Sequence, residues 1–331
     1  MNHFSSDSLK SESVVIPLQS FDERAGPYTM SFGYDPEPML ESVRRIGLIH
    51  PPLVDRDEEG RVRIVAGYRR ILALKALGQR EVRCMDLSGS GLPVSERLLI
   101  TFYDNASSRA FNGAEKGMAL KRLTDHFGEE EVVHHYMVLL GLPAHQPTLR
   151  TYIRLNDLEE DIRTGFAEDR LSLRTIRSLL EMDPVSRTAC AEWLLNLMFN
   201  FNEQSQFIEF INDISIYTKM SIRDLLSERS MQEVLKGGRS NGPQKIKAAL
   251  EYLRSRRMPT LSQAEKAFQQ MTRELRLPPG IGLRHPPFFE GPEYRLEIRF
   301  RNGRDLKGKI DALTANERLV DIDSPWKSPW K

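Results

Sequence analysis

Cysteine and long apolar runs are scarce in this sequence, and their scarcity excludes several classes of protein. The 331 residues contain two cysteines, Cys84 and Cys190, which lie too far apart along the chain to suggest a disulfide framework. No apolar run reaches the about 20 residues that a membrane-spanning helix needs. The polar residues 1–13 lack the apolar centre of a signal peptide. We therefore expect a cytoplasmic protein that is not inserted in a membrane.

A strong charge of either sign is also missing. The net charge is +1, from 47 basic and 46 acidic residues, which neither indicates nor excludes a nucleic-acid partner, because local patches decide such binding. Hydrophobic residues make up 40% of the chain and charged residues 28%, which is typical of globular proteins. This length is enough for two or three domains of roughly 100–200 residues each.

The first third of the chain alternates short strands and helices. Asp35 and Pro36 form a helix start signal, and Gly47 ends that helix. A second helix is expected at 68–77. The expected strands are 14–18, 52–55, 61–66 and 80–85. These elements predict a small α/β domain over 14–105, preceded by a disordered arm at 1–13.

The middle of the chain is helical in pattern, and it forms our second predicted domain, 106–236. Asn112 and Asp183 are helix N-cap candidates, the latter followed by Pro184. The Gly- and Asn-rich stretch 237–243 is the best linker candidate. The expected helices are 112–126, 129–140, 147–155, 158–166, 172–182, 184–198 and further helix within 207–235.

The remaining residues, 244–331, predict a small α+β domain. A basic helix at 245–257 and a second helix at 261–275 precede the stretch 294–301, which alternates apolar and charged residues like a strand with one wet face. One strand cannot bury its apolar face alone, so it needs a partner from 280–289 or from a second subunit. A short helix follows around Leu306, Ile310 and Leu313. The tail repeats Ser-Pro-Trp-Lys, either as a short linear motif or as plain disorder.

Gly67, Arg69 and Arg70 form the most informative local motif. A strand runs into Gly67, and the glycine opens a helix whose first turn holds both arginines. Backbone N–H groups at a helix start and guanidinium groups both suit a phosphate group. The same pattern fits a second interpretation, in which the arginines form ion pairs with carboxylates of their own domain.

The segment 36–87 resembles the N-terminal domain of ParB-family partition proteins, through residues 40–43, 47–54, 64–70 and 73–78. In that family the Gly-x-Arg-Arg motif grips the triphosphate of CTP; here Tyr68 stands where Glu or His is common. A second family motif, Glu-Asn-x-x-Arg, resembles Asp104-Asn105, with the arginine one position late at Arg109. The resemblance implies these nucleotide-binding residues: Gly47, Gly67, Tyr68, Arg69, Arg70, Asn105 and Arg109.

Asp104 keeps a carboxylate at the second motif, and a carboxylate is a natural ligand of Mg²⁺. The resemblance thus implies CTP and Mg²⁺ as cofactors, with Asp104 as the metal ligand. Asp104 and Asn105 also fit a helix cap between two domains.

Residues 129–155 fit a helix-turn-helix, and the ParB resemblance continues through 149–155 and 158–162. Side chains at the start of the second helix are placed to read bases, while arginines on later turns contact phosphates. Alternatively, Arg150 and Arg154 line a solvated helix face. The expected DNA-binding residues are His145, Gln146, Thr148, Arg150, Thr151, Arg154 and Arg174.

Two other site types are disfavoured. The α/β domain also resembles sulfiredoxin, which has a cysteine and a histidine after the glycine, but this chain has Tyr68 and Arg69 there. His134 and His135 point in different directions on a helix, and no third metal ligand lies nearby in sequence.

The expected fold class is therefore α+β multidomain, with a ParB/sulfiredoxin-like α/β domain, an all-α helix-turn-helix domain and a small α+β domain. The resemblance implies a sequence-specific DNA-binding protein for DNA partition, acting as a CTP-gated dimeric clamp on double-stranded DNA. It also implies a homodimer associated with the nucleoid, a ParA-type ATPase partner and at most slow CTP hydrolysis. Two alternatives stay open: a transcription or plasmid replication regulator without CTP switching, and a small-molecule kinase of the same fold.

Overall fold

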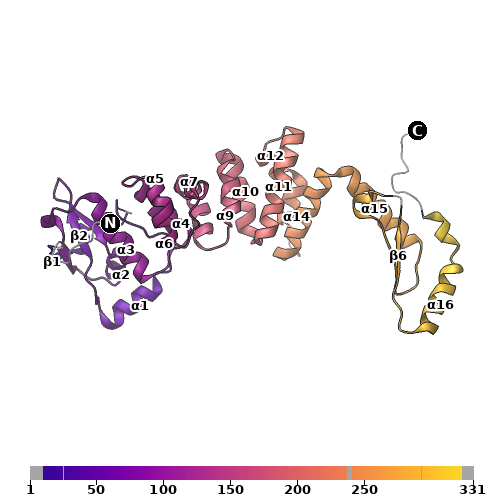
Figure 1. Ribbon diagram of the computed structural model, residues 1–331, viewed down its shortest axis with the longest axis horizontal. Coiled ribbons are helices and arrows are strands. Elements are labelled where there is room, and N and C mark those ends of the chain that lie inside the picture. Colours follow the sequence, from indigo (N-terminus) through magenta and orange to yellow (C-terminus); the bar gives the residue numbers. More distant parts are fainter. Residues whose placement is uncertain (1–9, 25, 237–240, 292, 323–331) are drawn as a thin grey trace. The chain divides into compact units, whose positions relative to one another are not determined.

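The structure is a computed structural model that describes residues 10–24, 26–236, 241–291 and 293–322. The chain divides into two compact units, 1–208 and 209–331, and each is described by itself (Figure 1). Most of the predicted disordered arm, the first four linker residues and the whole Trp-containing repeat lie outside the described residues. Our finer division of the chain into domains stays a prediction.

A four-stranded sheet forms one part of the first unit. Its order is β1-β4-β2-β3; β2 pairs with β3 and β1 with β4 antiparallel, whereas β2 and β4 are parallel. All four strands lie where the sequence pattern predicts them, although β1 begins two residues inside the predicted arm. The strands are β1 (Glu12–Pro17), β2 (Leu53–Arg56), β3 (Val62–Ala66) and β4 (Glu81–Asp86).

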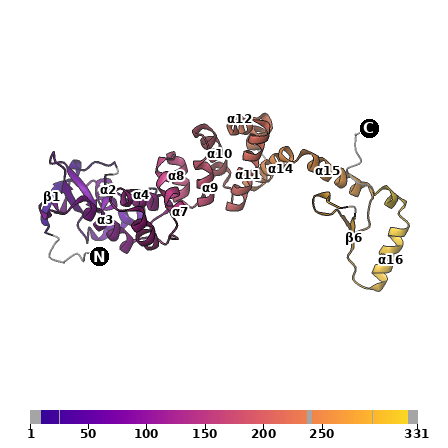
Figure 2. The same ribbon diagram turned by 45° about the horizontal axis from the view of Figure 1, so that its top comes forward.

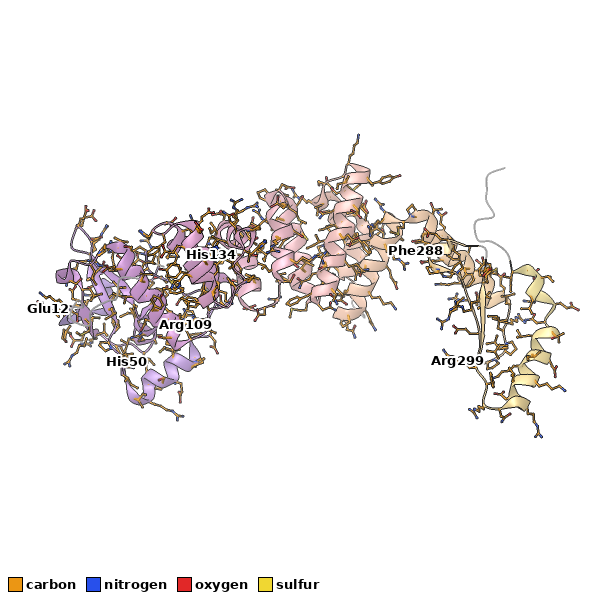
Figure 3. All side chains as sticks on the ribbon, viewed as in Figure 1. Glu12, His50, Arg109, His134, Phe288 and Arg299 are labelled. Atoms are coloured by element: carbon orange, nitrogen blue, oxygen red, sulfur yellow. The ribbon has the colours of Figure 1, made fainter. Side chains whose placement is uncertain are left out.

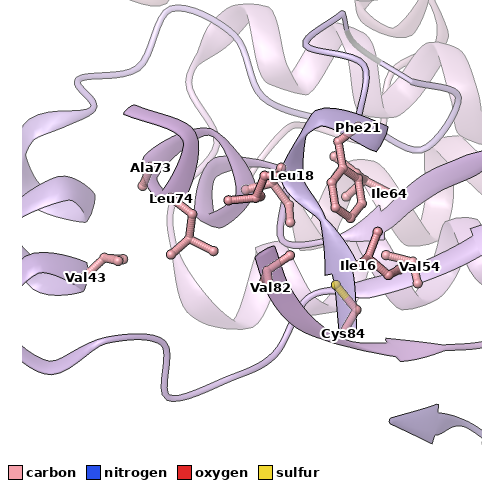
Figure 4. Close-up of a cluster of buried hydrophobic side chains, with 11 residues drawn as sticks. Ile16, Leu18, Phe21, Val43, Val54, Ile64, Ala73, Leu74, Val82 and Cys84 are labelled. Carbon is pink, nitrogen blue, oxygen red and sulfur yellow. The ribbon is translucent and has the colours of Figure 1, made fainter. Parts of the chain in front are cut away.

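The apolar core of this sheet lies between the strands and helix α2 (Tyr68–Ala76) (Figure 4). Helix α1 (Glu37–Ile46) packs on α2. The Asp35 carboxylate accepts a hydrogen bond from the Glu37 N–H at 3.0 Å, and Gly47 ends the helix with φ 70°. The predicted start signal is confirmed, with the helix beginning one residue later than Pro36. Two short 3-10 turns, η2 (Leu18–Ser20) and η3 (Ser88–Ser90), complete this part.

Helix α3 (Val94–Ser108) was not among the predicted elements. Its residues 98–103 read Leu-Leu-Ile-Thr-Phe-Tyr, a mixed apolar run whose periodicity does not separate a helix from a buried strand. Phe102 is 0% exposed and its ring contacts the rings of Phe111 and Tyr136, so α3 is fixed against the helices that follow.

The rest of the first unit is helical, as predicted. Helix α4 lies at its centre and contacts both α7 and α8 (Figure 2). A Cβ on Gly117 would lie 2.8 Å from the backbone oxygen of Tyr152, so only glycine allows α4 and α7 to approach this closely. The elements are α4 (Gly113–Thr124), α5 (Glu129–Glu131), the π-helix η4 (Val132–Tyr136), α6 (Met137–Leu139), α7 (Gln146–Arg154), η5 (Leu155–Asp157), α8 (Glu160–Ala167), α9 (Leu173–Leu180) and α10 (Pro184–Leu197).

Side-chain caps begin several of these helices. Asn112 accepts the Glu115 N–H and Asp183 accepts the N–H groups of Val185 and Ser186, as the sequence predicts. Each cap satisfies backbone donors that have no acceptor within the helix. The predicted helix over 129–140 is continuous, but it contains five residues of π-helix.

The second unit begins within helix α11 (Phe201–Thr218). Helix α14 starts inside the predicted linker, because the Asn241 side chain caps it. The remaining elements are α12 (Ile222–Ser227), α13 (Arg229–Lys236), α14 (Gly242–Arg257), α15 (Pro259–Glu274), β5 (Ile281–Arg284), the 3-10 turn η6 (Pro287–Phe289), β6 (Arg295–Ile298), α16 (Gly303–Thr314) and the 3-10 turn η7 (Glu317–Asp321).

Strand β6 finds its partner within the chain. It pairs antiparallel with β5, which decides between the two partners that the sequence left open. The strand is four residues long, shorter than the predicted 294–301. A small core that includes Phe268, Leu283 and Phe289 supports the hairpin.

The chain is therefore a mixed α+β protein, as predicted. Within the described ranges, no helix combines the length and the apolar character that crossing a bilayer requires.

We expect Phe102→Ala to lower the free energy of unfolding of the first unit by about 3–5 kcal/mol, because it leaves a cavity where a fully buried aromatic ring packs. Phe201→Ala is the matched control: its ring is 50% exposed, so its cost should stay below about 1 kcal/mol. Denaturant unfolding followed by circular dichroism measures both. Equal costs for the two variants would contradict the role of Phe102 in fixing α3.

Candidate functional site

Gly67 joins strand β3 to helix α2, and its backbone requires glycine. Its φ is 96°, and a Cβ there would lie 3.1 Å from the Cα of Pro52. The Arg70 and Ile71 N–H groups donate to the Gly67 oxygen at 2.9 Å and 3.1 Å. This leaves the Tyr68 and Arg69 N–H groups at the helix start to face an anion. The predicted helix start at Gly67 is confirmed.

Arg70 bridges this helix start to the end of α3. Its Nη1 donates to the backbone oxygens of His50 at 3.0 Å and Pro51 at 3.4 Å. Its Nη2 forms an ion pair with the Asp104 carboxylate at 3.0 Å, and Asp104 is about half exposed. Arg70 is thus held at the rim of the site by one half-exposed carboxylate and two carbonyl groups.

Arg69 lies deeper. Its Nε donates to the Ser31 hydroxyl at 3.2 Å, its Nη2 pairs with Glu115 at 2.5 Å, and its guanidinium stacks over the Tyr34 ring at 4.0 Å. A guanidinium has five N–H donors, and these bonds use two of them. Five minus two leaves three donors of Arg69 without a partner among the described residues.

Arg109, by contrast, is saturated. Its Nε donates to Asn105, its Nη1 to Ala110 and Glu115, and its Nη2 to Met30 and Ser31, which engages all five N–H groups. Burial lowers the pKa of Arg109, and the nearby Glu115 carboxylate opposes that effect. The geometry does not favour the nucleotide contact that we predicted for Arg109, since a phosphate would have to replace one of these bonds.

Glu115 is the residue of this site that sequence reasoning missed. It is 1% exposed and it binds Arg69 through one carboxylate oxygen and Arg109 through the other. It also accepts the Asn112 N–H at 3.1 Å, which completes a capping box at the start of α4. The spacing Asn112-x-x-Glu115 is the sequence signal of such a box, but it gives no sign of the two arginines.

These side chains surround a pocket of about 70 Å³. This is room for only a few water molecules, since one water needs about 10–15 Å³ of such volume, and the pocket opens to solvent at its rim. The predicted residues that line the pocket are Gly67, Tyr68, Arg69, Arg70, Asp104, Asn105 and Arg109. Gly47 does not line it and serves as the C-cap of α1.

Two lining residues are held by contacts of their own. The Tyr68 hydroxyl donates to the Glu23 backbone oxygen at 2.6 Å, and burial raises the pKa of Tyr68. The Asn105 side chain donates to the Thr101 oxygen and accepts from Arg109. Asn105 therefore positions Arg109 in this arrangement.

Metal and thiol chemistry find little support elsewhere. In the part of the chain that the structure describes, no group of three His, Cys, Asp or Glu side chains could hold a metal ion. His135 hydrogen-bonds the Tyr103 hydroxyl at 3.1 Å, and Figure 3 marks its neighbour His134. Burial raises the pKa of Cys84 to about 11 and of Cys190 to about 12, so neither is a ready thiolate.

Five of the seven predicted DNA-binding residues are exposed, on α7, at its start and on α9. His145, Gln146, Arg150 and Arg154 are exposed along α7 and its start. Gln146 donates to Glu129 at 2.7 Å, and Arg154 pairs with Glu181 at 2.7 Å. Arg150 on α7 and Arg174 on α9 are exposed, and neither forms an ion pair within the described ranges.

Thr148 and Thr151 do not face solvent, contrary to our prediction that they read bases. Thr148 is 3% exposed, its hydroxyl accepts from Arg177 at 3.0 Å and it contacts the His145 ring at 3.0 Å. The Thr151 hydroxyl donates to the Pro147 oxygen at 2.9 Å. Both threonines lie on the face of α7 that packs inward, because they are one helical turn apart.

The chain has relatives among proteins of known name, whereas no family model matches it. It is 24% identical over 259 residues to the "Probable chromosome-partitioning protein ParB" of Vibrio cholerae, covering 74% of this chain and 85% of that protein. It is 29% identical over 142 residues to the chromosome-partitioning protein ParB of Myxococcus xanthus, covering 43% and 45%. By sequence, the chain is similar to chromosome-partitioning proteins named ParB.

A solved ParB structure also matches part of the chain. The C-terminally truncated ParB of Caulobacter crescentus, complexed with CTP-γ-S, is 21% identical and covers 56% of this chain and 99% of that one, with a TM-score of 0.26. This score is too low to establish a common arrangement of the elements. The ParB relationship thus rests on the sequence matches.

We expect neither cysteine of the native protein to react with a thiol reagent near neutral pH. Because burial raises both thiol pKa values, the thiolate fraction is small below about pH 9 and grows only as the pH approaches those values. Labelling with a thiol-reactive dye, with and without denaturant, measures this. Fast labelling of the folded protein would contradict this expectation and would support a redox function.

Proposed function

We propose that this chain is a ParB-type partition protein that binds specific double-stranded DNA and a nucleoside triphosphate, and that it acts as a CTP-gated dimeric clamp. One observation carries the proposal: Arg69 and Arg70 open α2 beside Asp104 and Asn105 at the end of α3, in a chain related to ParB. The two motifs that the ParB resemblance singles out therefore meet at one pocket.

The phosphate contacts fall to Arg69, Arg70 and the backbone at Gly67. Arg69 has three N–H donors without a partner among the described residues, and Arg70 can exchange its half-exposed partner Asp104 for a phosphate. Asp104 would then be free to bind Mg²⁺, which usually takes one or two carboxylates together with phosphate oxygens. When bound, Mg²⁺ would neutralise phosphate charge. Arg109 and Asn105 act as positioning residues behind this site.

The DNA contacts fall to the exposed face of α7. Gln146 and Arg150 are placed near the helix start, where side chains reach base edges in a helix-turn-helix. His145, Arg154 and Arg174 are proposed phosphate contacts. Thr148 and Thr151 instead anchor α7 through their internal hydrogen bonds.

The proposed domains are a nucleotide-binding domain over 14–105, a DNA-binding domain over 106–236 and a C-terminal domain over 244–331. We propose a homodimer in the cytoplasm, associated with the nucleoid, with a ParA-type ATPase as a further partner. The name of the Vibrio cholerae relative supports a role in chromosome partitioning.

A second candidate function is DNA regulation by the same fold without a CTP switch. The saturated donors of Arg109 favour it, because a phosphate would have to displace one of their existing hydrogen bonds. Measuring CTP binding and hydrolysis with and without genomic DNA fragments separates the two functions. DNA binding without any CTP binding would support the regulator and overturn the clamp.

We expect Arg70→Ala to weaken CTP binding by about 1.5–3 kcal/mol, roughly 10- to 150-fold, because it removes charge-assisted hydrogen bonds to phosphate. The variant should stay folded, since its partner Asp104 remains partly in water. Arg44→Ala on α1 is the matched control, because Arg44 is exposed and pairs with Glu41 on the same helix. Unchanged CTP affinity in Arg70→Ala, measured by calorimetry, would refute the assignment.

We expect Arg150→Ala to cost about 1–3 kcal/mol in binding to the preferred DNA site, with a smaller loss on unrelated DNA, because base contacts carry specificity. Arg174→Ala should weaken binding to all DNA sequences. It should also reduce the slope of log K against the logarithm of the salt concentration by about one. Fluorescence anisotropy on selected genomic fragments at several salt concentrations measures both. A uniform loss for Arg150→Ala would reassign it to the phosphate backbone.

A further inference from the structure

Two positive side chains share one buried carboxylate behind the proposed phosphate site. Glu115 is 1% exposed, and it binds Arg69 from α2 and Arg109 from the end of α3, each at 2.5 Å. The local charge of the three side chains is therefore +1 (two cations and one anion). A carboxylate held by guanidinium groups occupies them in the same way as a phosphate does.

Arg69 and Arg109 differ in how easily they can exchange their present partners for an anion. Arg109 has every N–H group engaged with the protein, so it cannot turn without breaking several hydrogen bonds. Arg69 is attached to the protein by Ser31, Glu115 and its stacking on Tyr34, and three of its donors have no partner among the described residues. Arg69 also lines the pocket, whereas Glu115 does not. Arg69 is thus the group for which Glu115 and an incoming anion compete.

We infer that Glu115 is an internal counter-ion that sets the anion affinity of the pocket by competing with phosphate for Arg69. This inference rests on the proposed phosphate site. With Glu115 in place, the positive charge of Arg69 is already balanced, and a phosphate gains less by binding it. Without that negative charge, the two guanidinium groups lose their shared counter-ion in a place with little water. A bound anion would then supply the missing negative charge.

The same carboxylate connects the pocket to helix α4. Glu115 accepts the N–H groups of Asn112 at 3.1 Å and of Phe32 at 3.2 Å. If Arg69 leaves Glu115 for a phosphate, the carboxylate loses one of its two arginine partners, at the oxygen Oε1 that also accepts the Phe32 N–H. An anion in the pocket should therefore alter the hydrogen bond that the Phe32 N–H donates to Glu115.

A purely structural role for Glu115 makes different predictions. As a capping residue it would stabilise α4 equally with and without an anion, and its removal would not strengthen anion binding. Glu115→Gln separates the two roles, because glutamine also completes a capping box while it removes the negative charge.

The test measures inorganic tripolyphosphate binding to the full-length protein by calorimetry at constant ionic strength. We expect Glu115→Gln to bind tripolyphosphate about tenfold more tightly than the wild type, the scale of one charge-assisted hydrogen bond. We also expect a lower Tm without the anion and a larger rise in Tm with it. Glu115→Asp keeps the charge and should lie close to the wild type.

Glu159→Gln is the matched control. Glu159 forms a bidentate ion pair with Arg187 in the same unit, away from the pocket, and this pair lowers the pKa of Glu159. The control should lose stability without any change in tripolyphosphate affinity. Unchanged or weaker binding by Glu115→Gln would overturn the inference.

Wild-type protein provides a second test that does not depend on a variant that folds. Tripolyphosphate should change hydrogen exchange at the Phe32 amide, which shares Oε1 of Glu115 with Arg69, relative to the centre of α4, and unchanged exchange would contradict the competition. CTP binding separates this inference from the proposed function. Wild-type CTP binding with no gain in Glu115→Gln overturns the inference alone, whereas a tripolyphosphate gain without CTP binding supports it and overturns the CTP function.

Discussion

The buried Glu115 carboxylate is the interaction on which the proposed site depends. It joins the first turn of α2, the end of α3 and the start of α4, three elements that are separate in sequence. A buried carboxylate is costly unless charges and hydrogen bonds compensate it, and here two guanidinium groups and several backbone N–H groups do so. Removing either arginine would leave part of the buried negative charge uncompensated.

A second buried carboxylate fixes α3 from its other end. Asp55 on β2 is 0% exposed and pairs with Arg63 on β3 at 2.7 Å and with Arg97 on α3 at 3.0 Å. The Tyr28 hydroxyl donates to it at 3.3 Å. Helix α3 is therefore clamped to the sheet near its start and to α4 near its end, which determines where Asp104 and Asn105 lie.

The arginines of this site can have either a phosphate or the protein's own carboxylates as partners. The same arginines that suit a phosphate are satisfied by the protein's own carboxylates, as the second interpretation of the sequence holds. Arg70 lies at the rim with a half-exposed partner, whereas Arg109 lies inside with none of its donors free. Nucleotide binding would thus be an exchange of partners, and its strength is a difference between two sets of ion pairs.

Local elements of this fold could be predicted from the sequence with good accuracy. Gly67 with α2, the β2–β3 hairpin and the caps Asn112 and Asp183 all follow from backbone chemistry over a few residues. Helix α3 could not be predicted, since its apolar run fits a strand as well as a helix. The inward orientation of Thr148 and Thr151 could not be predicted either, because it depends on what packs against α7.

The residue types alone are enough to predict the phosphate-binding motif at Gly67, Arg69 and Arg70 and its position in the chain before Asp104 and the helices α5 to α7. Only the tertiary structure decided which charges meet. Glu115 is 46 residues from Arg69 and six from Arg109, and Asp104 is 34 from Arg70. Such pairs are fixed by the packing of α2, α3 and α4, because a buried charge selects its partner by distance in space and not along the chain.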